Sequence, residues 1–180
     1  MKVLVTAASQ HGATYEIAES IASVLRKRGF DSTVSRPEQV DDVTRYDAVV
    51  IGSAMYTGHW LEPANDFAHR FAHGLAQRPV WLFSSGPVGD PRRKLVQKMT
   101  ADPIELPSVL ALTRAREHRI FAGKLIGDDF GRAQRLSLLI FRGLQGDWRD
   151  WVEIERYASA IADALDDGAA AATTALEGKV

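Results

Sequence analysis

The fold is decided by Lys2-Val3-Leu4-Val5-Thr6 and the residues directly after it, Ala7-Ala8-Ser9-Gln10-His11-Gly12-Ala13-Thr14. The first five residues form the apolar run of a buried strand. Beyond the second stretch the spacing becomes helical, with Ile17, Ile21 and Leu25 on one face. A short turn of small and hydroxylic residues therefore joins an N-terminal strand to the first turn of a helix.

This turn predicts a phosphate-binding site. The N–H groups at a helix N-terminus are unpaired, and the helix dipole is positive there. Ser9 and Thr14 add hydroxyl groups, and Gly12 lets the backbone approach a ligand closely. The turn has neither the Gly-Lys-Ser/Thr of a Walker-type loop nor the pattern Gly-x-Gly-x-x-Gly. A phosphate held by amides and hydroxyls alone indicates flavin mononucleotide (FMN). The alternative is an ordinary polar connection of an α/β domain.

The composition limits the kind of protein. A chain of 180 residues with 46% hydrophobic and 25% charged residues is typical of one globular domain. The absence of cysteine excludes disulfides, iron–sulfur clusters and thiol catalysis, so redox chemistry would need an organic cofactor. The sequence shows no signal-peptide pattern and no apolar run of membrane-spanning length, so we expect the protein in the cytoplasm.

Charge is distributed unevenly along the chain. Residues 92–149 hold 12 Lys and Arg against 6 Asp and Glu, whereas the whole chain has a net charge of −1. Such a segment suits an anionic substrate, an acidic partner or the inner face of a membrane, and an unevenly charged solvated surface is equally consistent. No nucleic-acid-binding motif accompanies the charge, so nucleic acid is not an expected partner.

Strand-like and helix-like segments alternate, which predicts a doubly wound parallel sheet with helices on both faces. The expected strands are residues 2–6, 30–35, 48–51, 80–83 and 118–125. The expected helices are residues 13–28, 61–76, 92–99, 108–117, 132–143 and 148–165, with one helical turn inside 37–46. We expect one domain over residues 1–167, with an insertion at about 92–117, and a disordered tail over 168–180.

Three loops follow the first, third and fourth of these strands, at residues 7–14, 52–60 and 84–91. All three are rich in Gly, Ser or Thr, and the carboxyl ends of parallel strands lie at one edge, where ligands bind. In the second loop, an aromatic ring suits a planar heterocycle, so Tyr56 is expected near the cofactor and Trp60 in the core. For His59, a hydrogen bond to the ligand and a structural one both stay open.

Four motifs spread over most of the chain are shared with a known family. They are Ser9-x-x-Gly12-x-Thr14-x-Glu16-Ile17-Ala18, Tyr46-Asp47-x-Val49-Val50-Ile51-Gly52-x-x-x-x-x-Gly58-His59, Phe121-Ala122-Gly123 and Gly146-Asp147-Trp148-Arg149-Asp150-Trp151. With them the chain resembles the flavodoxin-like family, and within it the bacterial quinone-dependent protoporphyrinogen oxidases. It departs from that group in having Thr57, not a basic residue, before Gly58.

The resemblance implies a flavodoxin-like five-stranded parallel sheet of order 2-1-3-4-5, with FMN as the cofactor. The phosphate would lie on the first loop, and the flavin ring between the other two. The residues implied for the phosphate are Ser9, Gln10, His11, Gly12, Ala13 and Thr14. Those implied for the ring are Ser53, Ala54, Met55, Tyr56, Thr57, Gly58 and His59 on one side, and Ser84, Ser85, Gly86, Pro87, Val88 and Gly89 on the other.

The implied function is that of an FMN-dependent oxidoreductase. Its substrate would be a porphyrinogen whose propionates meet the basic segment 92–149, and its redox partner a quinone or a protein. Two alternatives stay open: a non-enzymatic electron carrier of the flavodoxin type, and a flavodoxin-like protein that binds a deazaflavin or no ligand. No catalytic side chain and no metal site are assigned, and a homodimer stays open.

Overall fold

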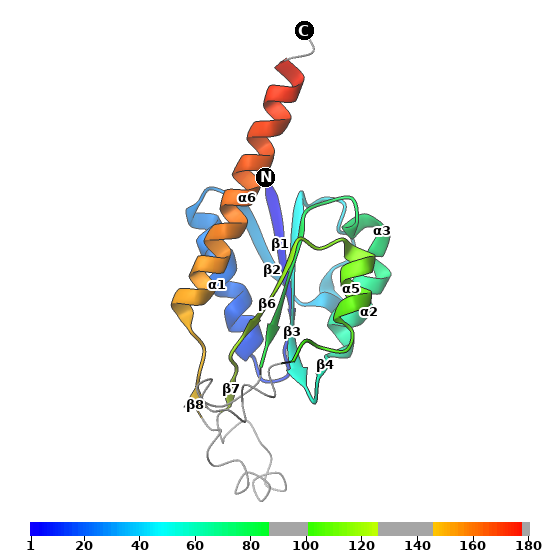
Figure 1. The fold of residues 1–180 in the computed structure, drawn as a ribbon, viewed down its shortest axis with the longest axis vertical. Coiled ribbons are helices and arrows are strands. Elements are labelled where there is room, and N and C mark those ends of the chain that lie inside the picture. Colours follow the sequence, from blue (N-terminus) through cyan, green and yellow to red (C-terminus); the bar gives the residue numbers. More distant parts are fainter. Residues whose placement is uncertain (87–100, 126–145, 178–180) are drawn as a thin grey trace, which may run out of the picture.

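A central sheet of parallel strands organises the molecule (Figure 1). The computed structural model describes residues 1–86, 101–125 and 146–177. The strand order is β2-β1-β3-β5-β6, which is the predicted order 2-1-3-4-5 because β5 and β6 are the fourth and fifth parallel strands. These strands are β1 (Lys2–Ala8), β2 (Asp31–Ser35), β3 (Ala48–Tyr56), β5 (Val80–Ser85) and β6 (Glu117–Phe121).

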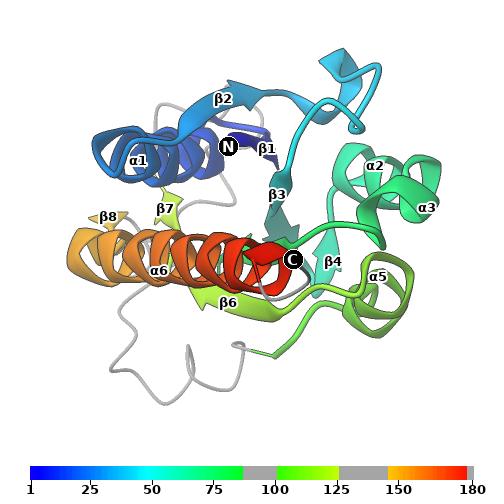
Figure 2. The same cartoon turned by 90° about the horizontal axis from the view of Figure 1, so that it is seen from above.

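Helices cover both faces of this sheet (Figure 2). One face packs against α1 (Ala13–Lys27) and α6 (Trp151–Glu177). The other packs against α2 (Glu62–Arg70), α3 (Ala72–Leu75) and α5 (Leu106–Thr113). The predicted doubly wound α/β architecture is therefore confirmed.

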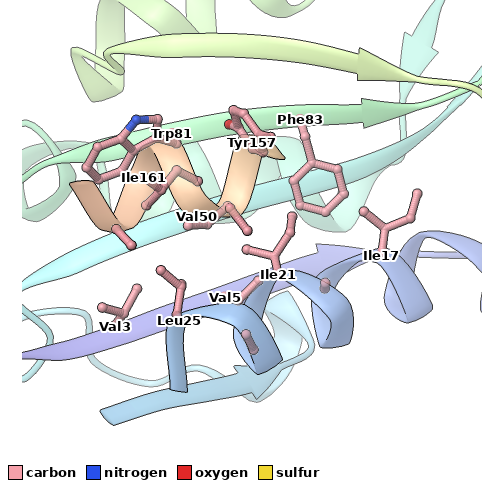
Figure 3. Packing of buried hydrophobic residues seen from close by; sticks show 14 of the residues in the cluster. Val3, Val5, Ile17, Ile21, Leu25, Val50, Trp81, Phe83, Tyr157 and Ile161 are labelled. Atoms are coloured by element: carbon pink, nitrogen blue, oxygen red, sulfur yellow. The ribbon is translucent and has the colours of Figure 1, made fainter. Parts of the chain in front are cut away.

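Each face of the sheet has its own apolar core, because successive side chains of a strand point to opposite faces. In β1, Val3 and Val5 belong to the core beneath α1 and α6, which Figure 3 shows from close by. Leu4, between them, belongs to the core beneath α2, α3 and α5. Alternate burial on both faces explains why the first strand reads as a continuous apolar run.

The helices depart from the predicted boundaries in three places. The helix expected over 61–76 is interrupted at Phe71, between α2 and α3. The helix expected over 108–117 is α5, which begins earlier because its Pro107 occupies a first-turn position, where proline needs no N–H partner. It also ends earlier, at Thr113, because Arg114 is left-handed with φ 53° and Glu117 already belongs to β6. The tail expected to be disordered from residue 168 is helical as far as Glu177, because the alanine-rich sequence continues α6 through Gly168 at a cost of about 1 kcal/mol.

The last predicted strand, 118–125, is divided in the structure. The parallel strand β6 ends at Phe121, and β7 (Lys124–Leu125) then pairs antiparallel with β8 (Gly146–Asp147). The helices expected at 92–99 and 132–143 lie outside the described residues, as does half of the basic segment. The turn expected inside 37–46 is the 3₁₀ helix η1 (Pro37–Gln39).

Candidate functional site

The first predicted loop lies between the carboxyl end of β1 and the N-terminus of α1. Gly12 caps the helix in the left-handed conformation, with φ 83°, and a Cβ built on it would meet no atom within 4 Å. The backbone N–H of Thr14 donates to Ser9 Oγ at 3.2 Å. The N–H groups of Gly12, Ala13 and Tyr15 have no acceptor in the described part of the chain. Open space and unpaired donors therefore coincide at the positive end of α1.

The two hydroxyl residues of this loop differ in access. Thr14 is buried, whereas Ser9 is half-buried and Gln10, His11 and Gly12 are exposed. Ser9 is therefore the more accessible hydroxyl, although its oxygen already accepts the bond from Thr14.

A charge cluster that the sequence reasoning missed borders the same loop. Arg149, which precedes α6, forms an ion pair of 2.8 Å with Glu16 in the first turn of α1 and one of 2.6 Å with Asp147 of β8. Lys124 of β7 lies 3.2 Å from Glu16. The hydrogen bonds from Arg149 lower the pKa of Asp147, although partial burial opposes this. The only sequence signal was Gly146–Trp151, a motif whose partners in α1, Ala13 and Glu16, lie more than a hundred residues before it.

The second predicted loop is mostly strand. β3 continues to Tyr56 and returns through a tight turn as β4 (His59–Trp60), with Met55 opposite Trp60. The prediction of a loop from residue 52 is therefore wrong, because Met55 and Tyr56 find antiparallel partners in β4. Thr57 and Gly58 form the turn with φ values of 50° and 82°.

The side chains of this hairpin are directed differently. Ser53 and Ala54 are buried, and Ser53 Oγ accepts a hydrogen bond from the N–H of Leu61 at 2.9 Å. Tyr56 is 41% exposed at the edge of the sheet, while Trp60 is buried, as predicted for the core. Tyr56, the Thr57–Gly58 turn and the exposed His59 are therefore the parts of the hairpin that a ligand at this edge could contact.

One carboxylate fastens the hairpin to the start of α5. Glu105 Oε1 lies 2.7 Å from His59 Nδ1, and Glu105 Oε2 accepts from the N–H of Trp60 at 3.0 Å. The N–H of Ile104 also donates to the carbonyl of Gly58 at 2.9 Å. Burial raises the pKa of Glu105, but the hydrogen bonds from His59 and Trp60 outweigh it, so the pKa lies below its usual value. His59 is thus engaged by the protein itself.

The third predicted loop leaves β5 beside this hairpin. Ser85 pairs with Ala54 in the sheet register, and a Cβ on Gly86 would lie 3.3 Å from the carbonyl oxygen of Met55. Gly86 has a φ of 134°, which strongly favours glycine. The backbone of the third loop therefore begins against the hairpin. Pro87, Val88 and Gly89 lie outside the described residues.

Ser84 faces the core instead of the edge. It is fully buried, and its Oγ accepts from Trp60 Nε1 at 2.8 Å and lies 2.8 Å from His118 Nε2. His118 Nδ1 lies 3.4 Å from Asp102, yet burial lowers the pKa of His118 more than this carboxylate raises it. With Trp60 donating to Ser84 Oγ, the hydroxyl of Ser84 is left to donate a hydrogen bond to Nε2 of a neutral His118, so Ser84 has a structural hydrogen-bond role.

The three segments meet at one edge of the sheet. Residue pairs at the carboxyl ends of neighbouring strands, Ala8 with Ser53 and Ala54 with Ser85, lie side by side. In Figure 1 these ends are at the bottom, near β4, β7 and β8. This is the edge at which open α/β sheets bind ligands. No helix in the described part of the chain is long and apolar enough to cross a membrane.

Comparison with known proteins agrees with this architecture. The chain is 24% identical over 179 residues to protoporphyrinogen IX dehydrogenase (quinone) of Escherichia coli strain K12, which covers 92% of this chain and 97% of that protein. A flavodoxin from the domain Archaea superposes with a TM-score of 0.62 at 18% identity, covering 92% of this chain and 99% of that one. The Streptococcus pneumoniae TIGR4 flavodoxin gives 0.61 at 21% identity, covering 91% and 99%.

The family model that describes the flavodoxin domain matches residues 4–147. This span runs from β1 to the end of β8 and includes all three segments of the candidate site. The chain therefore belongs to the flavodoxin family.

Proposed function

We propose that this protein is an FMN-dependent oxidoreductase. Family membership implies a flavin cofactor. The first turn of α1 is the observation that favours FMN over a flavin without a phosphate. There, the N–H groups of Gly12, Ala13 and Tyr15, which have no acceptor among the described residues, suit a phosphate. Riboflavin has no phosphate to occupy these donors.

The residues present fit the cofactor. The open space at Gly12 leaves room for a phosphate next to the amides. The flavin ring would lie at the edge between Tyr56, the Thr57–Gly58 turn and Gly86. When bound, the flavin supplies transfer of a hydride or of single electrons. The chain binds and orients the ring, and its backbone N–H groups stabilise negative charge on it.

We propose a porphyrinogen as the substrate and a quinone as the acceptor. The support is the E. coli relative, a quinone-dependent protoporphyrinogen IX dehydrogenase by name, which aligns over nearly the whole length of both chains. The basic segment 92–149 would hold the propionates, but not through Arg114 and Arg116, which precede β6 at the opposite edge of the sheet, where the N–H of Arg116 donates to the carbonyl of Val80. A quinone acceptor places the reaction at the inner face of a membrane, with the protein otherwise in the cytoplasm.

An anaerobic turnover assay tests this function. The FMN-loaded protein is mixed with protoporphyrinogen IX and a short-chain quinone, and porphyrin fluorescence is recorded against a protein-free sample. We expect fluorescence to rise with protein concentration and only with quinone present. Reversible flavin reduction without porphyrin formation would instead support the electron-carrier alternative.

A matched pair of serine variants tests the phosphate assignment separately. Ser9→Ala removes the acceptor that holds Thr14 N–H, so FMN should dissociate about tenfold more readily. Ser159→Ala, on α6, removes a comparable bond to the carbonyl of Glu155 and should leave FMN affinity unchanged. Equal FMN affinity in both variants would refute the assignment of the first loop.

A further inference from the structure

Arg149 is a buried cation with a complete set of partners. Its side chain is only 2% exposed, and its guanidinium contacts groups from three parts of the chain. Nε and Nη2 donate to the two carboxylate oxygens of Asp147 at 2.8 and 2.6 Å. Nη1 lies 2.8 Å from Glu16 and donates to the carbonyl of Ala13 at 3.1 Å. The guanidinium also lies over the ring of Trp151, 4.5 Å from its centroid.

The contact with Ala13 is the one that reaches the candidate phosphate site. The carbonyl of Ala13 and the N–H of Thr14 belong to the same peptide unit. Arg149 holds that unit at its oxygen, and Ser9 Oγ holds it at its nitrogen. The orientation of this peptide is therefore fixed from both sides. It lies next to the N–H groups of Gly12 and Ala13, for which residues 1–86, 101–125 and 146–177 provide no acceptor.

Charge alone does not explain the arrangement. Lys124 and Arg149 are matched by Glu16 and Asp147, so the cluster adds no net charge beside the loop. A buried guanidinium is costly to desolvate and is retained only where its geometry is well satisfied. The planar guanidinium of Arg149 has several N–H donors in fixed directions, so it can hold several acceptors in a defined geometry, which a single ammonium group could not.

We propose that Arg149 is a positioning residue for the cofactor phosphate. It fixes the Ala13–Thr14 peptide so that the N–H groups of the loop point at the 5′-phosphate of FMN. This inference rests on the proposed FMN function and deepens it, because it assigns part of the phosphate affinity to a residue far away in the sequence. Glu16 and Asp147 hold Arg149 in place.

The test compares FMN with riboflavin, which lacks the phosphate. Dissociation constants of both flavins are measured by fluorescence quenching for the wild type, Arg149→Met and Arg149→Lys. The ratio of the riboflavin constant to the FMN constant should fall about tenfold in Arg149→Met, with riboflavin affinity almost unchanged. Arg149→Lys retains the charge without the fork, so its ratio should fall at least threefold. This second variant keeps the test decisive if Arg149→Met does not fold.

Arg28→Met is the matched control. Arg28 also links α1 to α6, through Asp163 and Asp166 at 2.8 and 3.1 Å, but follows the opposite end of α1. In Arg28→Met the ratio of the riboflavin constant to the FMN constant should equal that of the wild type. An unchanged ratio in both Arg149 variants, or equal losses for the two flavins, would overturn the inference alone. A wild type that binds neither flavin would overturn the proposed function.

Discussion

Replacing Gly52 with alanine tests how tightly β3 packs against β5. Gly52 lies directly before the end of β3 that borders the candidate site. Gly52 lies opposite Phe83 of β5 in the sheet register. A Cβ at position 52 would lie 2.6 Å from Phe83 Cε2 and still closer to other atoms of that ring. Phe83 is fully buried beneath α1 and α6 (Figure 3), and its ring packs 6.0 Å from that of Phe121. The ring therefore has little room to move away from the added methyl group.

The expected loss in the free energy of unfolding follows from this lack of space. Overpacking of a dense core costs about 1–3 kcal/mol, and the upper end applies because the clash involves a ring held on all sides. Phe83→Leu alone should cost about 1–2 kcal/mol through lost burial and a small cavity. The smaller leucine makes room for the methyl group, so we expect Gly52→Ala/Phe83→Leu to cost about 2 kcal/mol instead of the additive 4–5 kcal/mol.

Urea unfolding of the flavin-free protein measures these free energies, because bound flavin would add its own stabilisation. The coupling energy of the cycle should be about 2–3 kcal/mol, with the two changes compensating each other. Strict additivity would refute the reasoning, as would a cost below about 0.5 kcal/mol for Gly52→Ala, the range expected of substitutions away from such contacts.

Two further predictions concern hydrogen bonds around the site and the core. Glu105→Gln should lower the free energy of unfolding by about 1 kcal/mol at neutral pH, since the charged bonds to His59 and Trp60 are weakened. The folded-state pKa of Glu105 is depressed, so the difference from wild type should persist above about pH 5 and shrink as pH falls below 4.5 in urea titrations. Tyr157→Phe removes a buried bond of 2.9 Å to the carbonyl of Leu82 and should lower Tm by about 2–4 °C in calorimetry. An effect of Glu105→Gln that does not depend on pH would contradict the role of the Glu105 carboxylate. An unchanged Tm in Tyr157→Phe would contradict the contribution of the Tyr157 hydrogen bond.

The sheet was predictable because its signals are local. Val3, Leu4 and Val5 are buried on alternate faces, and the apolar run reports that burial whatever lies on each side. The helix boundary at Gly12 was predictable for the same reason, since the turn chemistry and the helical spacing adjoin in sequence. Strand order came from the family resemblance, because periodicity alone does not specify which strands are neighbours.

The parts that were missed depend on partners distant in sequence. Ser84 looked like a loop hydroxyl, but His118 and Trp60 bind it within the core. Glu105 lies in a segment of weak pattern, and only the fold brings it to the hairpin. Arg149 meets Glu16 across 133 positions of sequence, and a single chain gives no signal of such a pair. Side-chain pairing across the fold thus decided the details of the site.

The most direct test of the account is whether the protein carries FMN. The absorbance spectrum of freshly purified protein is recorded, and mass spectrometry identifies any ligand under native and denaturing conditions. The account predicts a yellow protein that releases one FMN per chain on unfolding. A colourless protein that takes up no added FMN, or one that releases a deazaflavin, would contradict it.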